Sequence, residues 1–345
     1  MNTVESHTST HVSNSEPAII PSLAVIVPCY NEAEVLQFTL ETLESEIHSL
    51  ISQGKITSES FVYYVDDGSR DATWSIIETA AQQYQHVRGI RLSNNCGHQN
   101  ALLAGLFSTS ENVCITIDAD LQDDPRLMAK MLEDHAQGRD LVFAVRDTRE
   151  TDTWFKRNSA QAYYRFMSAL GVDLVFNHAD YRLMSRRAVD ALQRYPEAEM
   201  FLRGIVRHLG FKTSKVTYAR TERKAGETKY PLRKMLSFAW EGISSFSTVP
   251  LRAITVLGFI SGWLTVFVLV WVLGIRLFTE QAIPGWASIL LPVLFIGSVQ
   301  LICIGVLGEY IAKIYTEVKR RPRYHIDYAI GIKSRPEHEN NKYDL

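Results

Sequence analysis

Five short apolar runs recur through the first 145 residues and predict buried β-strands. Their starts lie 38, 27, 25 and 28 residues apart, which is the length of a strand followed by a crossover helix. The runs are Leu23–Val27, Phe61–Val65, Arg88–Leu92, Val113–Ile117 and Leu141–Val145. Because strands that are apolar on both faces alternate with helical segments, we predict an α/β fold with a mostly parallel sheet.

The segments between these runs carry helical signals. An apolar face with steps of three and four residues follows the first run, and it predicts an amphipathic helix. The residues of this face are Leu36, Leu40, Leu43, Ile47 and Leu50. Asp124 and Pro125 predict another helix start, with the aspartate as the cap and the proline in the first turn.

Two long apolar segments near the C-terminus contain no charged side chain. They comprise the 23 residues 253–275 and the 28 residues 281–308. At about 1.5 Å per residue, the shorter segment reaches roughly 35 Å, enough to cross a hydrocarbon core of about 30 Å. We predict two transmembrane helices, the second from about Trp286 to Leu307, where Pro292 is tolerable. Buried core helices are the less favoured alternative.

The distribution of basic residues predicts the orientation of this hairpin. A loop of about ten residues, 276–285, joins the two segments, so both flanks lie on one side. The flanks are richer in Lys and Arg than the loop, which places both flanks and both chain termini in the cytoplasm. The polar N-terminus lacks the pattern of a secretory signal.

These signals divide the chain into five parts. Helical apolar spacing between Pro231 and Pro250 predicts a juxtamembrane amphipathic helix in the membrane interface, with packing on the soluble domain as the alternative. The expected parts are a flexible tail (1–20), a soluble α/β domain (21–230), the juxtamembrane helix (231–250), the transmembrane hairpin (251–310) and a basic C-terminal tail (311–345).

Composition excludes several classes of protein. The 36 basic and 38 acidic side chains give a net charge of −2, which argues against a nucleic-acid partner. The four cysteines are scattered without a CxxC pair, so we expect neither a zinc site nor a disulfide framework. The chain has no Walker loop and no GxGxxG motif, which argues against nucleotide hydrolysis and dinucleotide redox chemistry.

Polar and acidic residues follow successive predicted strands. Asp118 and Asp120 come after the fourth strand, and Asp66 and Asp67 come after the second. The carboxyl ends of parallel strands meet at one edge of a sheet, so we expect these side chains to converge there. Paired carboxylates favour Mg²⁺ or Mn²⁺, ions that substrate phosphates help to coordinate. Helix capping is the alternative, and it explains Asp124 better than the Asp118–Asp120 pair.

The ordered motifs of the chain resemble glycosyltransferase family two, in particular its polyprenyl-phosphate glycosyltransferases. That subgroup includes bactoprenol glucosyltransferases and dolichol-phosphate mannose synthase. The resemblance covers roughly residues 22–325. The motifs are Pro28-x-Tyr-Asn-Glu, Asp66-Asp-Gly-Ser-x-Asp, Gly97-His-Gln, Asp118-Ala-Asp-Leu-Gln, Asp180-Tyr-Arg-Leu-Met-Ser-Arg-Arg, Gly226-Glu-Thr-Lys-Tyr-Pro-Leu-Arg-Lys and a late segment from Gly308.

The resemblance implies a GT-A nucleotide-sugar fold and roles for individual residues. Those implied to bind the donor are Pro28, Tyr30, Asn31, Glu32, Asp66, Asp67, Asn95 and Gly97. Asp118, Asp120 and Gln122 are implied to be catalytic and to hold the metal, Mg²⁺ or Mn²⁺. Those implied to bind the donor and acceptor phosphates are Arg146, Arg157, Arg182 and Lys229. Asn94 stands where relatives often have arginine, so charge compensation beside the nucleotide differs here.

The implied activity is an inverting, metal-dependent transfer of a hexose from a nucleotide sugar to polyprenyl phosphate. The resemblance favours glucose from UDP-glucose and undecaprenyl phosphate at the bacterial inner membrane, with GDP-mannose or a UDP-aminosugar as alternative donors. It also implies a homo-oligomer and a companion flippase. A transporter subunit and an inactive nucleotide-sugar-binding scaffold are the alternatives of another class. We interpret His98 as a structural residue, with donor contact as the alternative.

Overall fold

The computed structural model describes residues 20–146, 178–197, 202–218 and 286–332, together with scattered helical positions between 251 and 271. The predicted tail (except Ile20) and the predicted juxtamembrane helix lie outside the described residues, as do Arg157 and Lys229.

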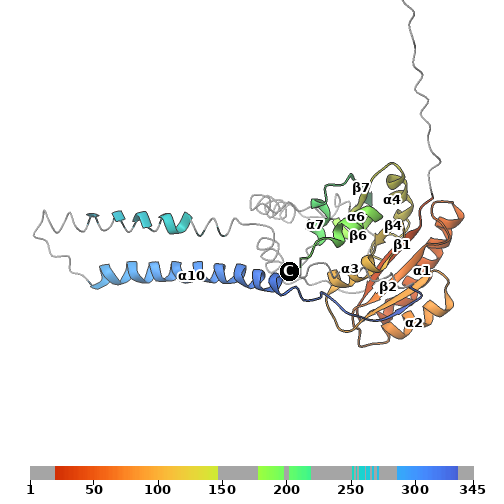
Figure 1. The fold of residues 1–345 in the computed structure, drawn as a ribbon, viewed down its shortest axis with the longest axis horizontal. Helices are drawn as coiled ribbons and strands as arrows, with labels where there is room; N and C mark the ends of the chain where they lie inside the picture. The colour runs from red at the N-terminus through yellow and green to blue at the C-terminus, as the bar shows by residue number, and fades with distance from the viewer. Residues whose placement is uncertain are drawn as a thin grey trace, which may run out of the picture.

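A single eight-stranded sheet forms the centre of the described structure, in the order β7-β5-β6-β4-β1-β2-β3-β8 (Figure 1). The strands are β1 (Leu23–Cys29), β2 (Phe61–Asp66), β3 (Val87–Leu92), β4 (Val113–Thr116), β5 (Leu141–Arg146), β6 (His178–Ser185), β7 (Thr213–Tyr218) and β8 (Ile326–Ile330). The pairs β1–β2, β1–β4, β2–β3 and β5–β7 are parallel. All five strands expected from the apolar runs are present, so the prediction of a mostly parallel α/β sheet is confirmed.

Two strands run against the others, and the sequence analysis did not anticipate them. β6 lies antiparallel between β4 and β5, and β8 pairs antiparallel with β3 at the edge of the sheet. β6 contains Asp180 and Arg182 and therefore lacks a continuous apolar run. β8 is mostly exposed and lies in the segment expected to be a basic tail. Its backbone pairing with β3, rather than burial, holds it in place.

Helices cover both faces of the sheet. α1 (Ala33–Ser52), α2 (Thr73–Gln83) and α4 (Leu127–Ala136) pack into one apolar core. α3 (His98–Ser108), α6 (Arg186–Gln193) and α7 (Leu202–His208) pack into the other. The predicted apolar face of α1, from Leu36 to Leu50, is fully buried, which confirms that helix.

The helix cap expected at Asp124 lies two residues too early, because Arg126 occupies the cap position of α4. α4 begins at Leu127, and the Asp124 carboxylate accepts a hydrogen bond from the Arg126 backbone at 3.0 Å. Asp124 and Pro125 instead form the turn before the helix, in which the Leu127 amide donates to the Asp124 carbonyl at 3.1 Å.

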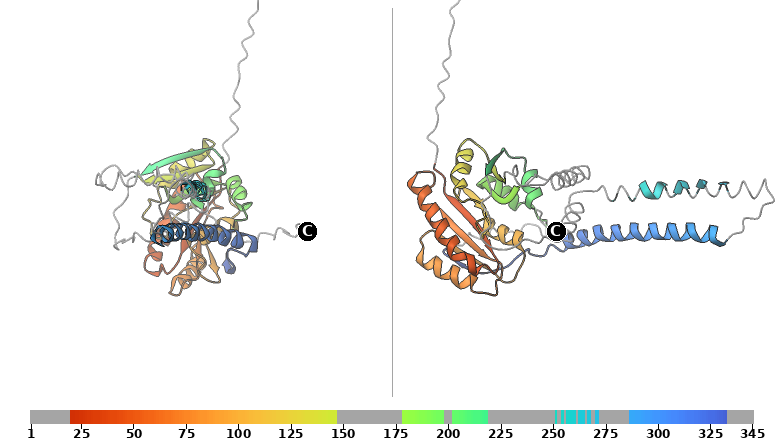
Figure 2. Two further views of the ribbon diagram at one scale, coloured as in Figure 1. Left: turned by 90° about the vertical axis from the view of Figure 1, so that its left-hand side faces the viewer. Right: turned by 180° about the vertical axis from the view of Figure 1, so that it is seen from behind.

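α10 (Trp286–Lys319) is a 34-residue helix that projects away from the sheet (Figures 1 and 2). Its apolar side chains are open to the surroundings, with Leu301 71% and Val318 73% exposed. The stretch Phe295–Lys319 has a mean hydropathy of 1.7 over an 18-residue window, and none of that window is buried. The second predicted span is therefore a helix, but it continues through the boundary expected at residue 310.

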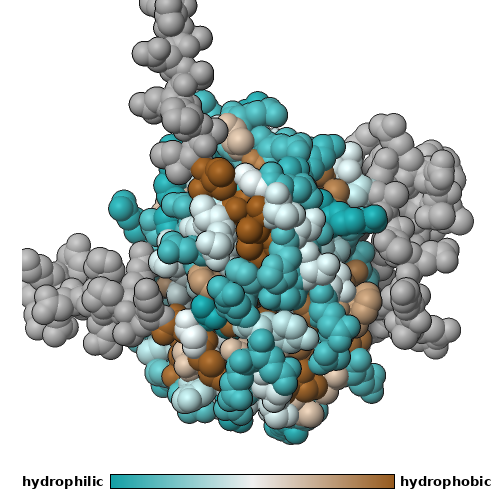
Figure 3. All heavy atoms as spheres, turned by 90° about the vertical axis from the view of Figure 1, so that its right-hand side faces the viewer, coloured by the Kyte–Doolittle hydropathy of each residue, from teal (hydrophilic) through white to brown (hydrophobic). Residues whose placement is uncertain are grey.

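Among the described residues, α10 is the one helix long and apolar enough to cross a membrane. The first predicted span falls on residues that are only partly described, so the two-helix hairpin stays a prediction. The exposed apolar surface is concentrated away from the sheet. Hydrophilic residues cover most of the face remote from α10, with small hydrophobic patches between them (Figure 3).

Candidate active site

The loops that follow β1 and β2 are hydrogen-bonded into one unit. Asn31 adopts the left-handed conformation, with φ of 54°. Its amide donates to the Ser69 hydroxyl at 2.9 Å, and its side-chain carbonyl accepts from the Arg70 amide at 2.9 Å. The Glu32 amide donates to the Thr73 hydroxyl at 2.9 Å. Asn31, one of the residues expected to bind the donor, thus holds these two loops together.

Asp67 joins the end of β2 to the loop after β3. Its carboxylate accepts hydrogen bonds from the backbone amides of Cys96, at 2.7 Å, and Gly97, at 2.9 Å. Burial raises the pKa of Asp67, although these two hydrogen bonds act in the opposite direction. The structure therefore brings Asp67 and Gly97 together, as expected for residues of one site, and gives Asp67 a structural task that the sequence did not reveal.

Asp66 lies beside Asp67 and is buried at the end of β2. Its carboxylate accepts from the Ser69 amide at 3.1 Å and lies 3.9 Å from the Arg91 guanidinium. Burial raises its pKa, and the contacts with Ser69 and Arg91 oppose that rise. Within the described structure, Asp66 thus interacts with Ser69 and Arg91.

Asp118, Asp120 and Gln122 occupy the turn that follows β4. The Gln122 side-chain amide donates to the Asp120 carboxylate, and the Gln122 backbone amide donates to it at 3.3 Å. The Thr39 hydroxyl of α1 donates to the Ala119 carbonyl at 2.6 Å and fixes the turn against the helix. Asp120 is exposed and the Asp118 side chain is 41% exposed, although Asp118 Oδ1 itself is buried.

Carboxylates in the loops after β1 and β4 affect one another's pKa at the carboxyl ends of the strands. Burial raises the pKa of Glu32, and the negative charges of Asp120 and Asp118 raise it further. Burial also raises the pKa of Asp118. His98 lowers this pKa, whereas the negative charges of Asp180 and Asp120 raise it. Residues from two separate strand ends therefore form one acidic cluster, which consists of Glu32, Asp118 and Asp120.

The acidic cluster suits a hard divalent cation. Asp118, Asp120 and the Gln122 side chain offer oxygen ligands, which Mg²⁺ and Mn²⁺ prefer. Burial and, after it, the neighbouring negative charges raise the pKa of Glu32 and Asp118, and a bound cation would relieve that repulsion. The residues present thus fit the expected metal.

A chain of ionisable side chains lies behind the acidic cluster, and sequence reasoning missed the role of Asp180 within it. His98 Nε2 lies 3.6 Å from Asp118 Oδ1 and 3.5 Å from Asp180 Oδ2. Asp180 in turn lies 3.2 Å from the Arg182 guanidinium. Asp180 stood inside a recognised motif without an assigned role, and the antiparallel placement of β6 beside β4 carries it to the site.

Arg182 lies deeper than a residue expected to bind a phosphate directly. It is 1% exposed, and its strand position is opposite Thr116 of β4. It forms an ion pair with Asp180, so in this structure it is connected to the acidic cluster through Asp180 and His98.

The other expected site residues have different surroundings. Pro28 is buried in β1 opposite Val65, and Tyr30 is 42% exposed just beyond it. Asn95 is exposed in the loop after β3, and its backbone packs closely against Gly68. Arg146 is the last residue of β5, paired with Tyr218 of β7.

Comparisons with known proteins agree with these observations. Residues 24–193 match the model of the family described as glycosyl transferase family 2. An uncharacterized glycosyltransferase of Bacillus subtilis, YkoT, is 47% identical over 89% of this chain and 91% of its own length. The bactoprenol glucosyl transferase of Shigella phage SfX is 37% identical over 88% of this chain and 98% of its own length.

Solved structures also resemble the chain. Glucosyl-3-phosphoglycerate synthase from Mycobacterium tuberculosis, crystallised with Mn²⁺, uridine diphosphate and phosphoglyceric acid, gives a TM-score of 0.45 at 18% identity. The match covers 65% of this chain and 76% of that one.

The family match extends over the described core of the sheet, from β1 to α6, and includes the acidic cluster. The mostly parallel sheet with antiparallel β6 is the GT-A-like α/β architecture that the motifs implied. With relatives this similar over nearly their whole length, the chain belongs to glycosyltransferase family 2 and is a glycosyltransferase.

Proposed function

We propose that this glycosyltransferase moves glucose from UDP-glucose to undecaprenyl phosphate at the cytoplasmic face of a bacterial plasma membrane. The acidic cluster carries the proposal, because it gathers oxygen ligands where the strand ends of the sheet meet. The relative named bactoprenol glucosyl transferase supports the choice of acceptor and sugar.

The chemistry requires a leaving group that accepts negative charge. An oxygen of the lipid phosphate attacks the anomeric carbon while the bond from that carbon to the UDP oxygen breaks, through an oxocarbenium-like transition state. Mg²⁺ or Mn²⁺ held by Asp118, Asp120 and Gln122 would supply Lewis-acid stabilisation of the diphosphate. In-line attack inverts the anomeric centre, so an α-linked donor gives a β-linked lipid product.

The protein groups position the substrates in this proposal. A phosphate nucleophile is already ionised near neutral pH, so no residue has to remove a proton from it. Asn31 and Asp67 hold the donor loops in register through the hydrogen bonds described above. His98 lies against Asp118 and Asp180, where a protonated imidazole would offset their negative charge.

The lipid acceptor implies attachment to a membrane, and α10 supports this. Its apolar side chains are exposed along the length of the helix, where a hydrocarbon environment would cover them. We further propose that residues 251–310 form the membrane hairpin, preceded by the juxtamembrane helix 231–250, and that Arg146, Arg157, Arg182 and Lys229 serve the substrate phosphates.

The test is an assay of purified full-length protein with undecaprenyl phosphate and a panel of nucleotide sugars, with the lipid product read by mass. We expect a hexose-bearing lipid from UDP-glucose that disappears when EDTA is added and returns with Mg²⁺ or Mn²⁺. GDP-mannose or a UDP-aminosugar as the better donor would reassign the sugar.

Asp120→Ala tests the acidic cluster in the same assay. We expect product formation to fall at least about a hundredfold. The variant loses a metal ligand, and a metal ion typically stabilises the charge of such a transition state by several kcal/mol. Asp124→Asn is the matched control, because Asp124 lies in the same loop but pairs with Arg126. Near-normal turnover by a folded Asp120→Ala protein would contradict the metal role.

A further inference from the structure

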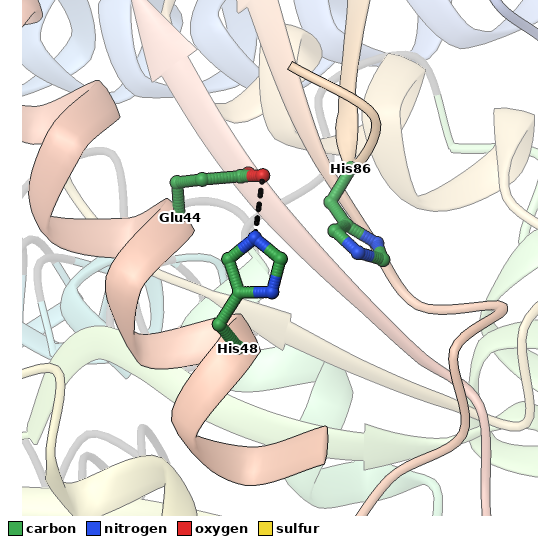
Figure 4. Close-up of side chains that lie close together, drawn as sticks. All are labelled: Glu44, His48 and His86. Carbon is green, nitrogen blue, oxygen red and sulfur yellow. Dashed lines mark ion pairs between the residues drawn. The ribbon is translucent and has the colours of Figure 1, made fainter. Parts of the chain in front are cut away.

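A second group of candidate metal ligands lies at the amino ends of the strands, opposite the acidic cluster. It consists of Glu44 and His48, one turn apart on α1, and His86, which immediately precedes β3 (Figure 4). One potential ligand atom from each residue lies within 4.8 Å of the other two. The acidic cluster lies at the carboxyl ends of the strands, whereas His86 lies at the amino end of β3. A six-residue strand is roughly 20 Å long, so about this distance separates the two ends of the strands.

The tautomer of His86 leaves one ring nitrogen free to bind a metal. Its Nδ1 lies 2.8 Å from the Ser60 carbonyl oxygen, which can only accept a hydrogen bond. Nδ1 therefore carries the proton, and Nε2 of the neutral ring presents a lone pair. Histidines that bind metals are typically held by this kind of hydrogen bond from the other ring nitrogen to a carbonyl.

The Glu44 carboxyl is buried although it carries a charge when ionised. The residue is 7% exposed, and Oε2 forms no hydrogen bond among the described residues. Oε1 lies 3.3 Å from His48 Nε2. A buried carboxylate with an unpaired oxygen is costly, and a bound cation would compensate it.

The separations suit a small transition-metal ion. Two ligands bound at about 2.0–2.1 Å in tetrahedral geometry lie roughly 3.3 Å apart, close to the Glu44–His48 separation. All three ligand atoms lie within 4.8 Å of one another, and the His48 side chain is 62% exposed, so it has room to adjust to an ion. Two imidazoles and one carboxylate favour Zn²⁺ over Mg²⁺ or Mn²⁺.

We propose that Glu44, His48 and His86 form a site for Zn²⁺ or a similar divalent transition ion, with water as the fourth ligand. The ion would join α1 to the residue that precedes β3, and it would stabilise the fold at a distance from the acidic cluster. The proposal does not depend on the sugar or lipid that the enzyme uses. The cysteine count gave no hint of it, because none of the three ligands is a cysteine and His86 lies far from Glu44 and His48 in the sequence.

Zinc binding to the full-length, tag-free protein tests the proposal. The protein is purified in detergent, stripped with EDTA and titrated with ZnCl₂ by calorimetry, in an Asp120→Ala background that removes the acidic cluster as a competing site. We expect one zinc per chain and a rise in Tm on binding. Co²⁺ as a spectroscopic probe is expected to give the visible absorption of a tetrahedral ion.

His48→Ala is the deciding variant, because His48 is exposed and its loss leaves no cavity in the core. We expect the Kd for zinc to rise at least about tenfold and the zinc-dependent rise in Tm to vanish. Glu44→Gln, which keeps the side-chain shape, is expected to weaken binding similarly. His208→Ala, an exposed histidine on α7, is the matched control and is expected to bind zinc normally.

Two results would overturn the site. One is a protein that is folded by circular dichroism but binds no zinc in the Asp120→Ala background. The other is a His48→Ala protein that retains the same zinc affinity and the same rise in Tm as its parent.

Discussion

Gly68 shows how one residue sets the geometry of the donor loops. Its φ is +67°, and a Cβ at this position would lie 2.6 Å from the Asn94 carbonyl carbon and 2.7 Å from the Asn95 nitrogen. Both neighbours are backbone atoms, so the loop after β3 would have to move to make room. The close approach of the two loops therefore requires glycine at this position.

We expect Gly68→Ala to destabilise the protein by more than the roughly 1–2 kcal/mol of a left-handed alanine. Gly54→Ala is the matched control, because Gly54 has the same φ of +67° but a Cβ there would have no atom within 4 Å. Urea unfolding of both variants measures the difference. Equal losses of free energy would mean that the loop moves away without cost.

Asp140 supports a prediction about pH. Its carboxylate accepts hydrogen bonds from the Arg187 guanidinium and the Ser185 hydroxyl, which ties the start of β5 to the end of β6. The hydrogen bond from Arg187 is the main reason that the pKa of Asp140 is lowered. A group with a lowered folded-state pKa stabilises the fold above its unfolded pKa, about 3.9 for aspartate, and loses this contribution as the pH falls.

We therefore expect Asp140→Asn to lower the urea midpoint at pH 7 and to differ progressively less from the parent protein below about pH 4. Urea titrations across this range measure the effect. Glu59→Gln, at an exposed loop position, provides the control. A difference that persists unchanged at low pH would show that the aspartate acts through packing instead of charge.

At the scale of elements, Arg323 fixes the chain that returns from α10 to the sheet. Its guanidinium donates to the carbonyls of Tyr195, at 2.5 Å, and Glu197, at 2.8 Å. The Ser93 amide then donates to the His325 carbonyl at 3.0 Å, where β8 begins to pair with β3. Arg323 thus connects three elements that are remote in sequence, namely α6, α10 and β8.

We expect Arg323→Ala to loosen β8, because the two carbonyls lose a charged donor at a part-buried position. Hydrogen exchange read by mass spectrometry is expected to show faster exchange in Ile326–Ile330. Arg321→Ala, at an exposed position in the same segment, is the control. Unchanged exchange in β8 would assign its stability to the pairing with β3 alone.

Secondary structure could be predicted from the sequence where a segment had one clear apolar pattern. The runs that became β1 to β5 and the face of α1 were predictable because their burial leaves a period in the sequence. β6 and β8 were not predictable, since charged residues interrupt one and exposed residues make up most of the other. Their position depends on strands that precede them by many residues.

At the scale of the whole molecule, the acidic cluster and the exposed apolar helix lie in different parts of the structure. The α/β part carries the acidic cluster. The helix α10 projects beyond that part (Figure 2), and its apolar side chains are exposed. Basic residues follow the apolar part of α10, among them Lys313 and Lys319. This asymmetry favours a cytoplasmic position for the C-terminal side of the helix.

A topology reporter tests this arrangement. Alkaline phosphatase fused after Leu345 is expected to be inactive in cells, and green fluorescent protein at the same place is expected to fluoresce, because the proposed topology keeps that end in the cytoplasm. Fusions after Thr279, in the predicted loop between the spans, provide the opposite control. An active phosphatase at Leu345 would contradict the proposed cytoplasmic position of this end.

The sequence by itself determined the family, the main strands and the acidic residues after β4, because buried periodicity and motif spacing are local properties of the chain. Tertiary structure alone decided that Asp180 reaches His98, that Asp67 holds the loop after β3, and that Glu44 and His48 meet His86. Each of these contacts joins residues on different elements. Only the packing of those elements, which no local pattern encodes, brings such side chains close together.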